Sequence, residues 1–149
     1  MKPEDNFDFE IDAMLADRAT TMLEFTADYR PLIIYAIMRK DLEMDAGKLA
    51  AQTGHAYAEA IEHASQQTIA DYKGTGHGTK ITMTVDNLNQ IKRIYSEARL
   101  AGIPVHLVID RSHVILPHFT GQPIVTGVAL GPVFKDEARF ITKRGSLVK

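Results

Sequence analysis

The sequence predicts a single α/β domain over residues 31–149, preceded by an acidic, partly helical extension over residues 1–30. Short apolar runs alternate with longer amphipathic stretches, a pattern typical of strands joined by helical crossovers in a sheet that is at least partly parallel. The 149 residues, of which 45% are hydrophobic and 24% charged, suffice for one globular domain with a buried core.

The N-terminal half predicts two helices and a strand. Residues 1–9 are expected to be disordered, and apolar residues at helical spacing predict a helix over 11–25. Pro31 ends this helix, because the residue before a proline is steered away from helical dihedral angles. The apolar run 32–38 predicts the first strand, and the amphipathic stretch 46–70 predicts a long helix after it.

The C-terminal half predicts three more strands, rich in β-branched and apolar residues, at 80–85, 105–109 and 123–130. Asp86 is a good N-cap for a helix over 87–100, and Gly102–Pro104 closes that helix. A short last helix is expected at 135–142. Together the strands form a four-stranded sheet flanked by helices.

Composition argues against several functional classes. The absence of cysteine excludes disulfides, cysteine-ligated zinc and thiol catalysis. No apolar run reaches the ~18 residues of a membrane helix, and the N-terminus lacks the layout of a secretory signal, so a cytoplasmic protein without membrane contact is expected. The glycine-rich loop Gly74–Gly78 precedes a strand, whereas a phosphate-binding loop follows a strand and opens a helix. This loop is therefore expected to be a plain connection. The histidines lack the spacing of a helical metal motif, so no metal is expected.

The charge is unevenly distributed along the chain. Residues 1–28 carry eight acidic and two basic residues, whereas residues 29–149 carry 15 basic and 11 acidic residues. A net charge of +4 on the main domain is compatible with a nucleic-acid ligand without requiring one. The acidic extension could be a helix packed on the domain, a mimic of nucleic acid, or an arm that binds a partner.

Three functional side chains share one face of the helix expected over 46–70. Lys48, Gln52 and His55 stand at offsets of 0, 4 and 7, within about 60° of one another at 100° per residue. Spacing alone also fits an ordinary solvated stripe. Gly54 in the helix interior is expected to serve close packing, since glycine there costs roughly 1 kcal/mol relative to alanine.

Two further polar residues belong to predicted strands. Asp110 follows the apolar run 105–109, at a strand end where α/β sheets place functional groups. Its position alone also fits a carboxylate that caps local backbone. Thr126 lies in the last strand, where an ordinary β-forming role is the simpler interpretation.

The segment after the first strand closely resembles the signature of the type 2 peptidyl-tRNA hydrolases. The matching residues are Arg39-Lys40-Asp41-Leu42-x-Met44-x-x-Gly47-Lys48-x-Ala50-Ala51-Gln52-x-x-His55-Ala56. Two supporting matches are Ala98–Pro104, similar to a helix-ending segment of that family, and Thr126–Pro132, similar to its last strand. The resemblance covers about residues 32–143 and excludes the acidic extension.

This resemblance implies hydrolysis of the ester that joins a peptide to the terminal ribose of tRNA. It also implies a four-stranded mixed sheet, a homodimer, and no metal or organic cofactor; peptidyl-tRNA is the expected partner and DNA is not. Lys48, Asp110 and Thr126 match the family's functional lysine, aspartate and threonine. Gln52 and His55 match the helix signature, with His55 a candidate for proton transfer. Backbone phosphates are expected to contact Arg39, Lys40, Lys80 and Arg111.

The segment after Asp110 departs from the family pattern. The family usually continues with Ala-Gly, a basic residue and a threonine, whereas this chain has Arg111-Ser112-His113-Val114 in a longer stretch that contains Pro117, Gly121 and Pro123. An alternative function is therefore a family member with impaired catalysis that binds RNA or protein. A weaker third possibility is a hydrolase of another ester or amide.

Overall fold

The computed structural model describes residues 8–16 and 30–148. Contacts divide the chain into two units, Met1–Arg30 and Pro31–Lys149. The first contains a helix at residues 8–16 with exposed hydrophobic side chains such as Phe9 and Met14. The expected disorder is therefore wrong for residues 8 and 9. The expected helix over 11–25 is present as far as residue 16, and its remainder lies outside the described residues.

The second unit is built on a five-stranded mixed sheet with the strand order β3-β6-β1-β2-β7. The four longer strands are those that the sequence predicts, with slightly different ends: β1 (Leu32–Arg39), β2 (Thr79–Val85), β3 (Val105–Asp110) and β6 (Ile124–Phe134). β1 and β2 are parallel, whereas β6 is antiparallel to both β1 and β3. The predicted α/β class and the partly parallel sheet are confirmed.

Three very short strands escaped the sequence prediction. β7 (Ser146–Leu147) pairs with β2 at one edge of the sheet. β4 (Val114–Ile115) and β5 (Phe119–Thr120) pair with each other in a separate hairpin between β3 and β6. Strands of two residues are too short to show the alternating pattern by which strands are found.

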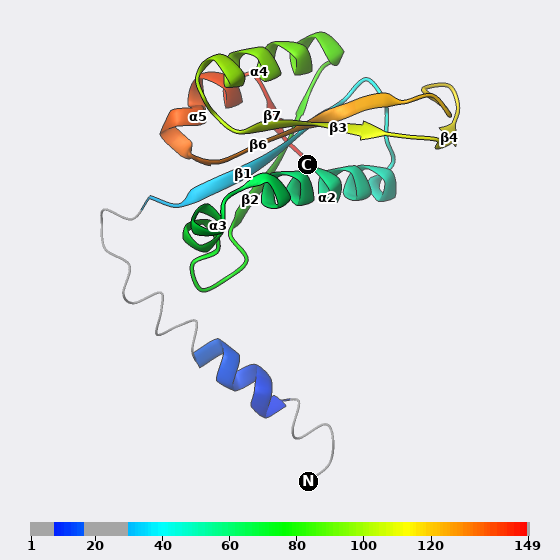
Figure 1. Ribbon diagram of the computed structural model, residues 1–149. Coiled ribbons are helices and arrows are strands. Elements are labelled where there is room, and N and C mark those ends of the chain that lie inside the picture. Colours follow the sequence, from blue (N-terminus) through cyan, green and yellow to red (C-terminus); the bar gives the residue numbers. More distant parts are fainter. Residues whose placement is uncertain (1–7, 17–29, 149) are drawn as a thin grey trace. The chain divides into compact units, whose positions relative to one another are not determined.

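Helices cover both faces of the sheet (Figure 1). α2 (Ala46–His63) and α3 (Gln66–Lys73) lie on one face, and α4 (Leu88–Leu100) and α5 (Lys135–Thr142) lie on the other. The sequence predicts α2 and α3 as one helix. They separate because the Ser65 side chain accepts a hydrogen bond from the Thr68 amide at 3.1 Å and caps a new helix.

Strand alternation supplies a separate core for each face. Ile34, Ala36 and Met38 face α2, where Ala56 and Ala60 let the helix approach closely. Ile33, Tyr35 and Ile37 face α4 and α5, together with larger residues such as Ile91, Ile94 and Ile141. Each fully buried isoleucine contributes roughly 1.5–3 kcal/mol. Two packed faces thus hold β1 and β6 at the centre of the domain.

Two local expectations are wrong. The N-cap of α4 is Asn87, whose side chain accepts from the Gln90 amide at 3.2 Å, and not Asp86. Gly54 does not serve close packing, because a Cβ at this position would meet nothing within 4 Å. No helix among the described residues has the length and apolar character needed to cross a membrane.

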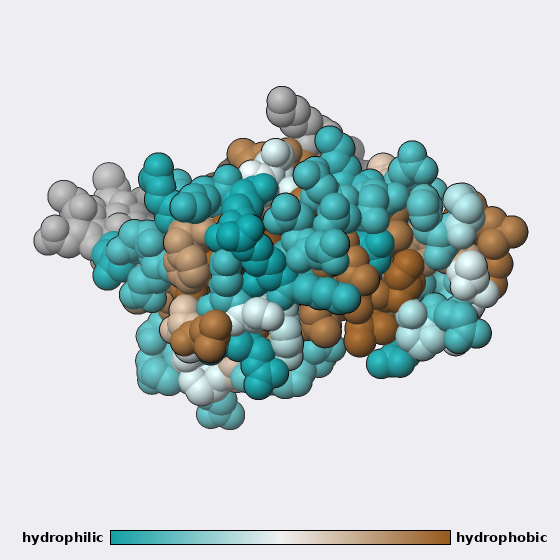
Figure 2. Space-filling model, turned by 90° about the horizontal axis from the view of Figure 1, so that it is seen from above, coloured by the Kyte–Doolittle hydropathy of each residue, from teal (hydrophilic) through white to brown (hydrophobic). Residues whose placement is uncertain are grey.

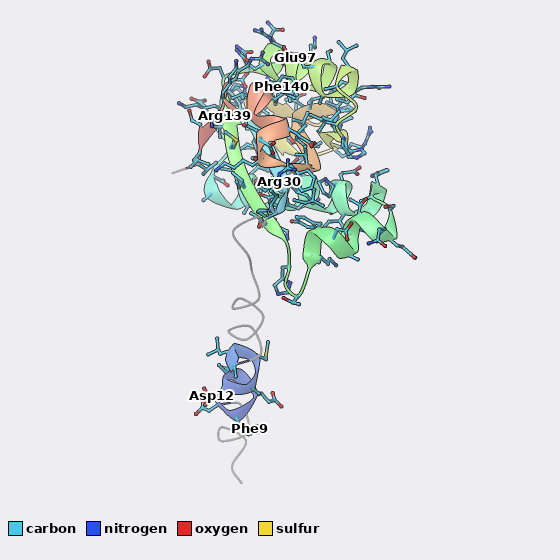
Figure 3. The ribbon with its side chains drawn as sticks, turned by 90° about the vertical axis from the view of Figure 1, so that its left-hand side faces the viewer. Phe9, Asp12, Arg30, Glu97, Arg139 and Phe140 are labelled. Carbon is cyan, nitrogen blue, oxygen red and sulfur yellow. The ribbon has the colours of Figure 1, made fainter. Side chains whose placement is uncertain are left out.

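Glu97 connects α4 to the segment that follows α5. Its carboxylate accepts hydrogen bonds from Arg144 and, at 3.1 Å, from Arg93. Figure 3 shows Glu97 on α4 above the α5 residues Arg139 and Phe140. The Arg144 hydrogen bond is the main cause that lowers the pKa of Glu97. The carboxylate is therefore more stable in the folded chain than in the unfolded one.

We expect Gly54→Ala to stabilise the domain by about 0.5–1 kcal/mol, because alanine is the better helix former and the added methyl group is unobstructed. Gly127→Ala is the contrasting variant. Its Cβ would lie 2.5 Å from the Ile37 carbonyl oxygen and 2.7 Å from Met38 Sδ, so we expect a loss of about 1–3 kcal/mol. Urea unfolding measures both, and a destabilised Gly54→Ala variant would contradict this account.

We expect Glu97→Gln to be less stable than the wild type at neutral pH, with a difference that shrinks as the solution is acidified. A carboxyl group whose pKa is lowered by folding stabilises above its unfolded pKa, and this contribution is lost as the pH falls through the folded pKa. Unfolding free energies at pH 7 and about pH 3 test this, since they lie on either side of the carboxyl range. A difference independent of pH would refute the assignment.

Candidate active site

The first turn of α2 directs the side chain of Lys48 toward the sheet. The Asp45 side chain caps the helix by accepting a hydrogen bond from the Lys48 amide at 2.8 Å. Lys48 itself is only 9% exposed, and Gln52 one turn later is only 2% exposed. The interpretation of this stripe as a solvated face is therefore wrong for both residues. Burying a lysine and an amide is unfavourable unless their polar groups find partners.

The partners of Lys48 and Gln52 come from the end of β3. Lys48 Nζ lies 3.0 Å from Asp110 Oδ1, and Gln52 Nε2 donates to the same oxygen at 3.2 Å. The Lys48–Asp110 pair is nearly buried, with side chains 7% and 12% exposed. Residues that are 62 positions apart thus form one charged centre where α2 crosses the edge strand β3.

Thr126 completes this network from β6. Its hydroxyl is fully buried and donates to Gln52 Oε1 at 2.8 Å, with the Val108 carbonyl oxygen 3.3 Å away. Because Thr126 takes the oxygen of the Gln52 amide, the amide nitrogen is directed toward Asp110. Thr126 therefore reaches the carboxylate through Gln52.

The two oxygens of the Asp110 carboxylate differ in their hydrogen bonding. Asp110 Oδ2 is buried and has no hydrogen-bond partner among the described residues, whereas Oδ1 accepts from two donors. A buried acceptor without a partner costs about 1–3 kcal/mol. Oδ2 is therefore the atom at this centre that stands to gain most from a water molecule or a substrate hydroxyl group.

The hairpin after Asp110 adds two side chains to the Lys48 environment. His113 Nδ1 is in hydrogen-bonding contact with Lys48 Nζ, and the Phe119 ring lies under the same ammonium with its centroid 4.6 Å away. A cation over an aromatic face is attracted by the ring quadrupole. The sequence prediction included neither residue, because both belong to the stretch in which the chain departs from the family pattern.

A pocket of about 240 Å³ opens beside Lys48, between the start of α2 and the hairpin. Its hydrophobic lining includes Leu42, Met44 and Phe119, and Glu43 and Asp45 supply carboxylates. Ile115 and Leu116 of the hairpin also line it and are 43% and 73% exposed. Hydrophobic side chains gather at this end of the domain in Figure 2. The pocket is large enough for a small portion of a substrate.

His55 lies outside this network. It is exposed and lines a different pocket, together with Glu59 and Glu62 of α2 and residues of β3. The structure thus brings together Lys48, Gln52, Asp110 and Thr126 and places His55 further along the helix.

The four basic residues that are expected to contact tRNA phosphates lie in different surroundings. Arg39 binds Asp41 through two hydrogen bonds of 2.8 and 3.0 Å and donates to the Val125 carbonyl oxygen at 2.9 Å. The hydrogen bonding of Arg39 to the Asp41 carboxylate is the main reason why the pKa of Asp41 is lowered. Lys40 and Arg111 are exposed at the Asp110 end of the sheet.

Lys80 lies at the opposite end of the sheet, paired with Ile34 near the start of β1. It donates to the His77 carbonyl oxygen at 2.6 Å and stands over the Tyr72 ring. Burial lowers its pKa, with a further contribution from Lys73. Of the four basic residues, Lys40 and Arg111 are exposed at the end of the sheet that carries the charged centre, whereas Lys80 lies at the opposite end.

Known proteins are similar to this chain in sequence. The family described as Peptidyl-tRNA hydrolase PTH2 matches residues 32–148. A peptidyl-tRNA hydrolase of Haloquadratum walsbyi is 35% identical over 111 residues, which are 74% of this chain and 93% of the relative. One from Methanocaldococcus jannaschii is 34% identical, covering 68% of this chain and 85% of the relative.

A solved structure has the same fold at low sequence identity. It is a protein of unknown function from Agrobacterium tumefaciens strain C58, with a TM-score of 0.54 and 16% identity, covering 78% of this chain and 96% of that one. The family match spans nearly all of the α/β domain and includes every residue of the charged centre. The chain therefore belongs to the peptidyl-tRNA hydrolase PTH2 family.

Proposed function

We propose that the charged centre hydrolyses the ester between tRNA and a peptide or an N-blocked amino acid. The observation that carries this proposal is the buried Lys48–Asp110 pair, in which one carboxylate oxygen is held by two donors and the other has no partner among the described residues. Family membership supports the substrate. Ester hydrolysis needs a positioned water and a donor for the developing oxyanion, and this centre contains groups suited to both tasks.

Asp110 is the group that activates water. A water molecule hydrogen-bonded to Oδ2 attacks the ester carbonyl carbon while the carboxylate accepts its proton. When the tetrahedral intermediate collapses, the bond between the carbonyl carbon and the ribose oxygen breaks. The proton held by Asp110 passes to the departing ribose oxygen, so that the products are a free peptide acid and tRNA with its terminal hydroxyl restored.

Lys48 stabilises the negative charge that develops in this reaction. Its ammonium has three donors, of which one is directed to Asp110 and one to His113. The third is suited to the carbonyl oxygen of the substrate as it becomes an oxyanion, where one preorganised donor accounts for about 10²–10³ in kcat. His113 and the Phe119 ring hold the ammonium in place.

Gln52 and Thr126 are positioning residues in this proposal. The hydroxyl of Thr126 orients the amide of Gln52, and that amide orients Asp110.

Lys40 and Arg111 are the exposed cations best placed to contact tRNA phosphates, whereas Arg39 joins β1 to Asp41 and β6. We also infer that the chain acts as a cytoplasmic homodimer, as the family resemblance implies; light scattering would measure the oligomeric state.

We expect Asp110→Asn and Lys48→Met each to lower kcat for N-acetyl-aminoacyl-tRNA by at least about 100-fold, because each removes a group that acts in the transition state. Release of free tRNA is the measurement. Asp71→Asn on α3 and Lys92→Met on α4 are matched controls with the same chemical changes at exposed positions away from the centre, and we expect them to retain wild-type turnover.

Undiminished turnover in either active-site variant, with the fold checked by circular dichroism, would refute the assigned roles. The same assay distinguishes the alternative of a binding protein with impaired catalysis, which is motivated by the altered segment after Asp110. Wild-type protein that retains charged tRNA on a filter but releases no free tRNA would support the binding protein instead of the hydrolase.

A further inference from the structure

A second polar cluster lies at the other end of α2, away from Lys48. Glu59 and His63 are one helical turn apart, and His106 of β3 stacks on His63 with ring centroids 4.6 Å apart. One oxygen or nitrogen from each of the three side chains lies within 4.8 Å of the other two. Two imidazoles and a carboxylate from two different elements therefore converge on one point of the surface.

The sheet geometry explains why this cluster forms. Residues two apart on a strand face the same side of a sheet, so His106, Val108 and Asp110 all face α2. The start of α2 contacts β3 at Asp110, and its end contacts β3 at His106. The polar stripe of α2 thus meets the edge strand twice.

We propose that Glu59, His63 and His106 bind a divalent first-row transition-metal ion, such as Zn²⁺, that joins α2 to β3. The site is separate from the Lys48–Asp110 centre, and the proposal does not depend on the hydrolase function. Nitrogen from imidazole and oxygen from carboxylate are donors that Zn²⁺ accepts, whereas Mg²⁺ and Ca²⁺ require mostly oxygen donors. Three protein ligands leave the fourth tetrahedral position for water.

The hydrogen bond of His63 favours this role. His63 Nδ1 lies 2.8 Å from the backbone carbonyl oxygen of Glu59. Because a carbonyl oxygen only accepts, the proton is on Nδ1 and the lone pair of the neutral ring is on Nε2. Metal-binding histidines commonly donate their other ring nitrogen to a carbonyl or a carboxylate, which fixes the tautomer and the ring orientation.

The distances require only a local adjustment. Ligand atoms of a tetrahedral zinc ion lie roughly 3.4 Å apart, given bonds of about 2.1 Å, whereas the three groups are here within 4.8 Å of one another. Glu59 Oε2 lies 3.4 Å from His63 Nδ1, the nitrogen that carries the proton, and the two imidazole planes are inclined by 24°. The His63 ring must therefore rotate before its lone pair, that of His106 and the Glu59 carboxylate face one ion. Rotation about histidine χ2 is suitable because that torsion is broad.

Carboxylates beside the cluster also suit a metal. Glu59 lines a pocket together with Glu62 of α2 and Leu107 of β3, the residue next to His106. The two carboxylates of this pocket attract a cation to the surface on which the cluster lies.

A metal at this point would act on the elements that carry the charged centre. β3 is an edge strand, held by β6 on only one side. An ion that joins His106 to α2 restrains β3 four residues before Asp110 and restrains the helix that carries Lys48. Metal binding is therefore expected to slow amide hydrogen exchange in β3, since local opening becomes less favourable.

The test is calorimetric titration of the full-length, tag-free protein with Zn²⁺ at pH 7.5 in a non-chelating buffer. We expect one ion per chain, and we expect His106→Gln and Glu59→Gln each to weaken binding by at least about tenfold, because each removes a ligand. His77→Gln is the matched control, since it removes an exposed histidine outside the cluster. Excess Mg²⁺ is expected not to compete.

Equal Zn²⁺ affinity in the wild type and His106→Gln would overturn the proposal, as would a wild type that binds no ion. Hydrogen exchange gives an independent readout: slower exchange of the β3 amides with Zn²⁺ in the wild type, but not in His106→Gln, would support the connection between α2 and β3. Zn²⁺-dependent slowing of β3 in both proteins would contradict it.

Discussion

The structure of the site depends on the burial of one ammonium group. Lys48 is 9% exposed on a helix that crosses the edge of the sheet, and a charge in such a position is tolerated only with well-placed partners. Asp110, His113 and the Phe119 ring supply those partners from the end of β3 and from the hairpin. These contacts connect the end of β3 and the hairpin to the first turn of α2.

The remainder of the network follows from that pair. Asp110 accepts from Lys48 and Gln52 through the same oxygen, and Thr126 fixes the Gln52 amide from β6. The chain of contacts runs from one helix to two neighbouring strands, so the packing of the α2 face of the sheet sets the geometry of the carboxylate. Short residues such as Ala56 and Ala60 let α2 lie close enough for these bonds.

Sequence patterns predicted the α/β class and the four longer strands, because strand alternation and helical spacing are local properties. Lys48, Asp110 and Thr126 were predicted as functional residues only through the family resemblance, since their positions alone also fitted ordinary structural roles. The patterns did not predict the break at Ser65, which one capping side chain causes, or the contacts of His113 and Phe119, which arise from a hairpin of two-residue strands. Spacing along α2 also could not reveal that His106 approaches Glu59 and His63, because that juxtaposition depends on how β3 is placed against the helix.

The central claim is that Lys48 and Asp110 act as one unit. A double-mutant cycle on kcat/KM for N-acetyl-aminoacyl-tRNA, with Lys48→Met, Asp110→Asn and the double variant, tests it most directly. The effects of mutating groups that act together in catalysis are strongly non-additive. The account therefore predicts that the double variant has about the same kcat/KM as the less active of the two single variants. A loss in the double variant equal to the product of the two single losses would show that the residues act independently and would contradict the account.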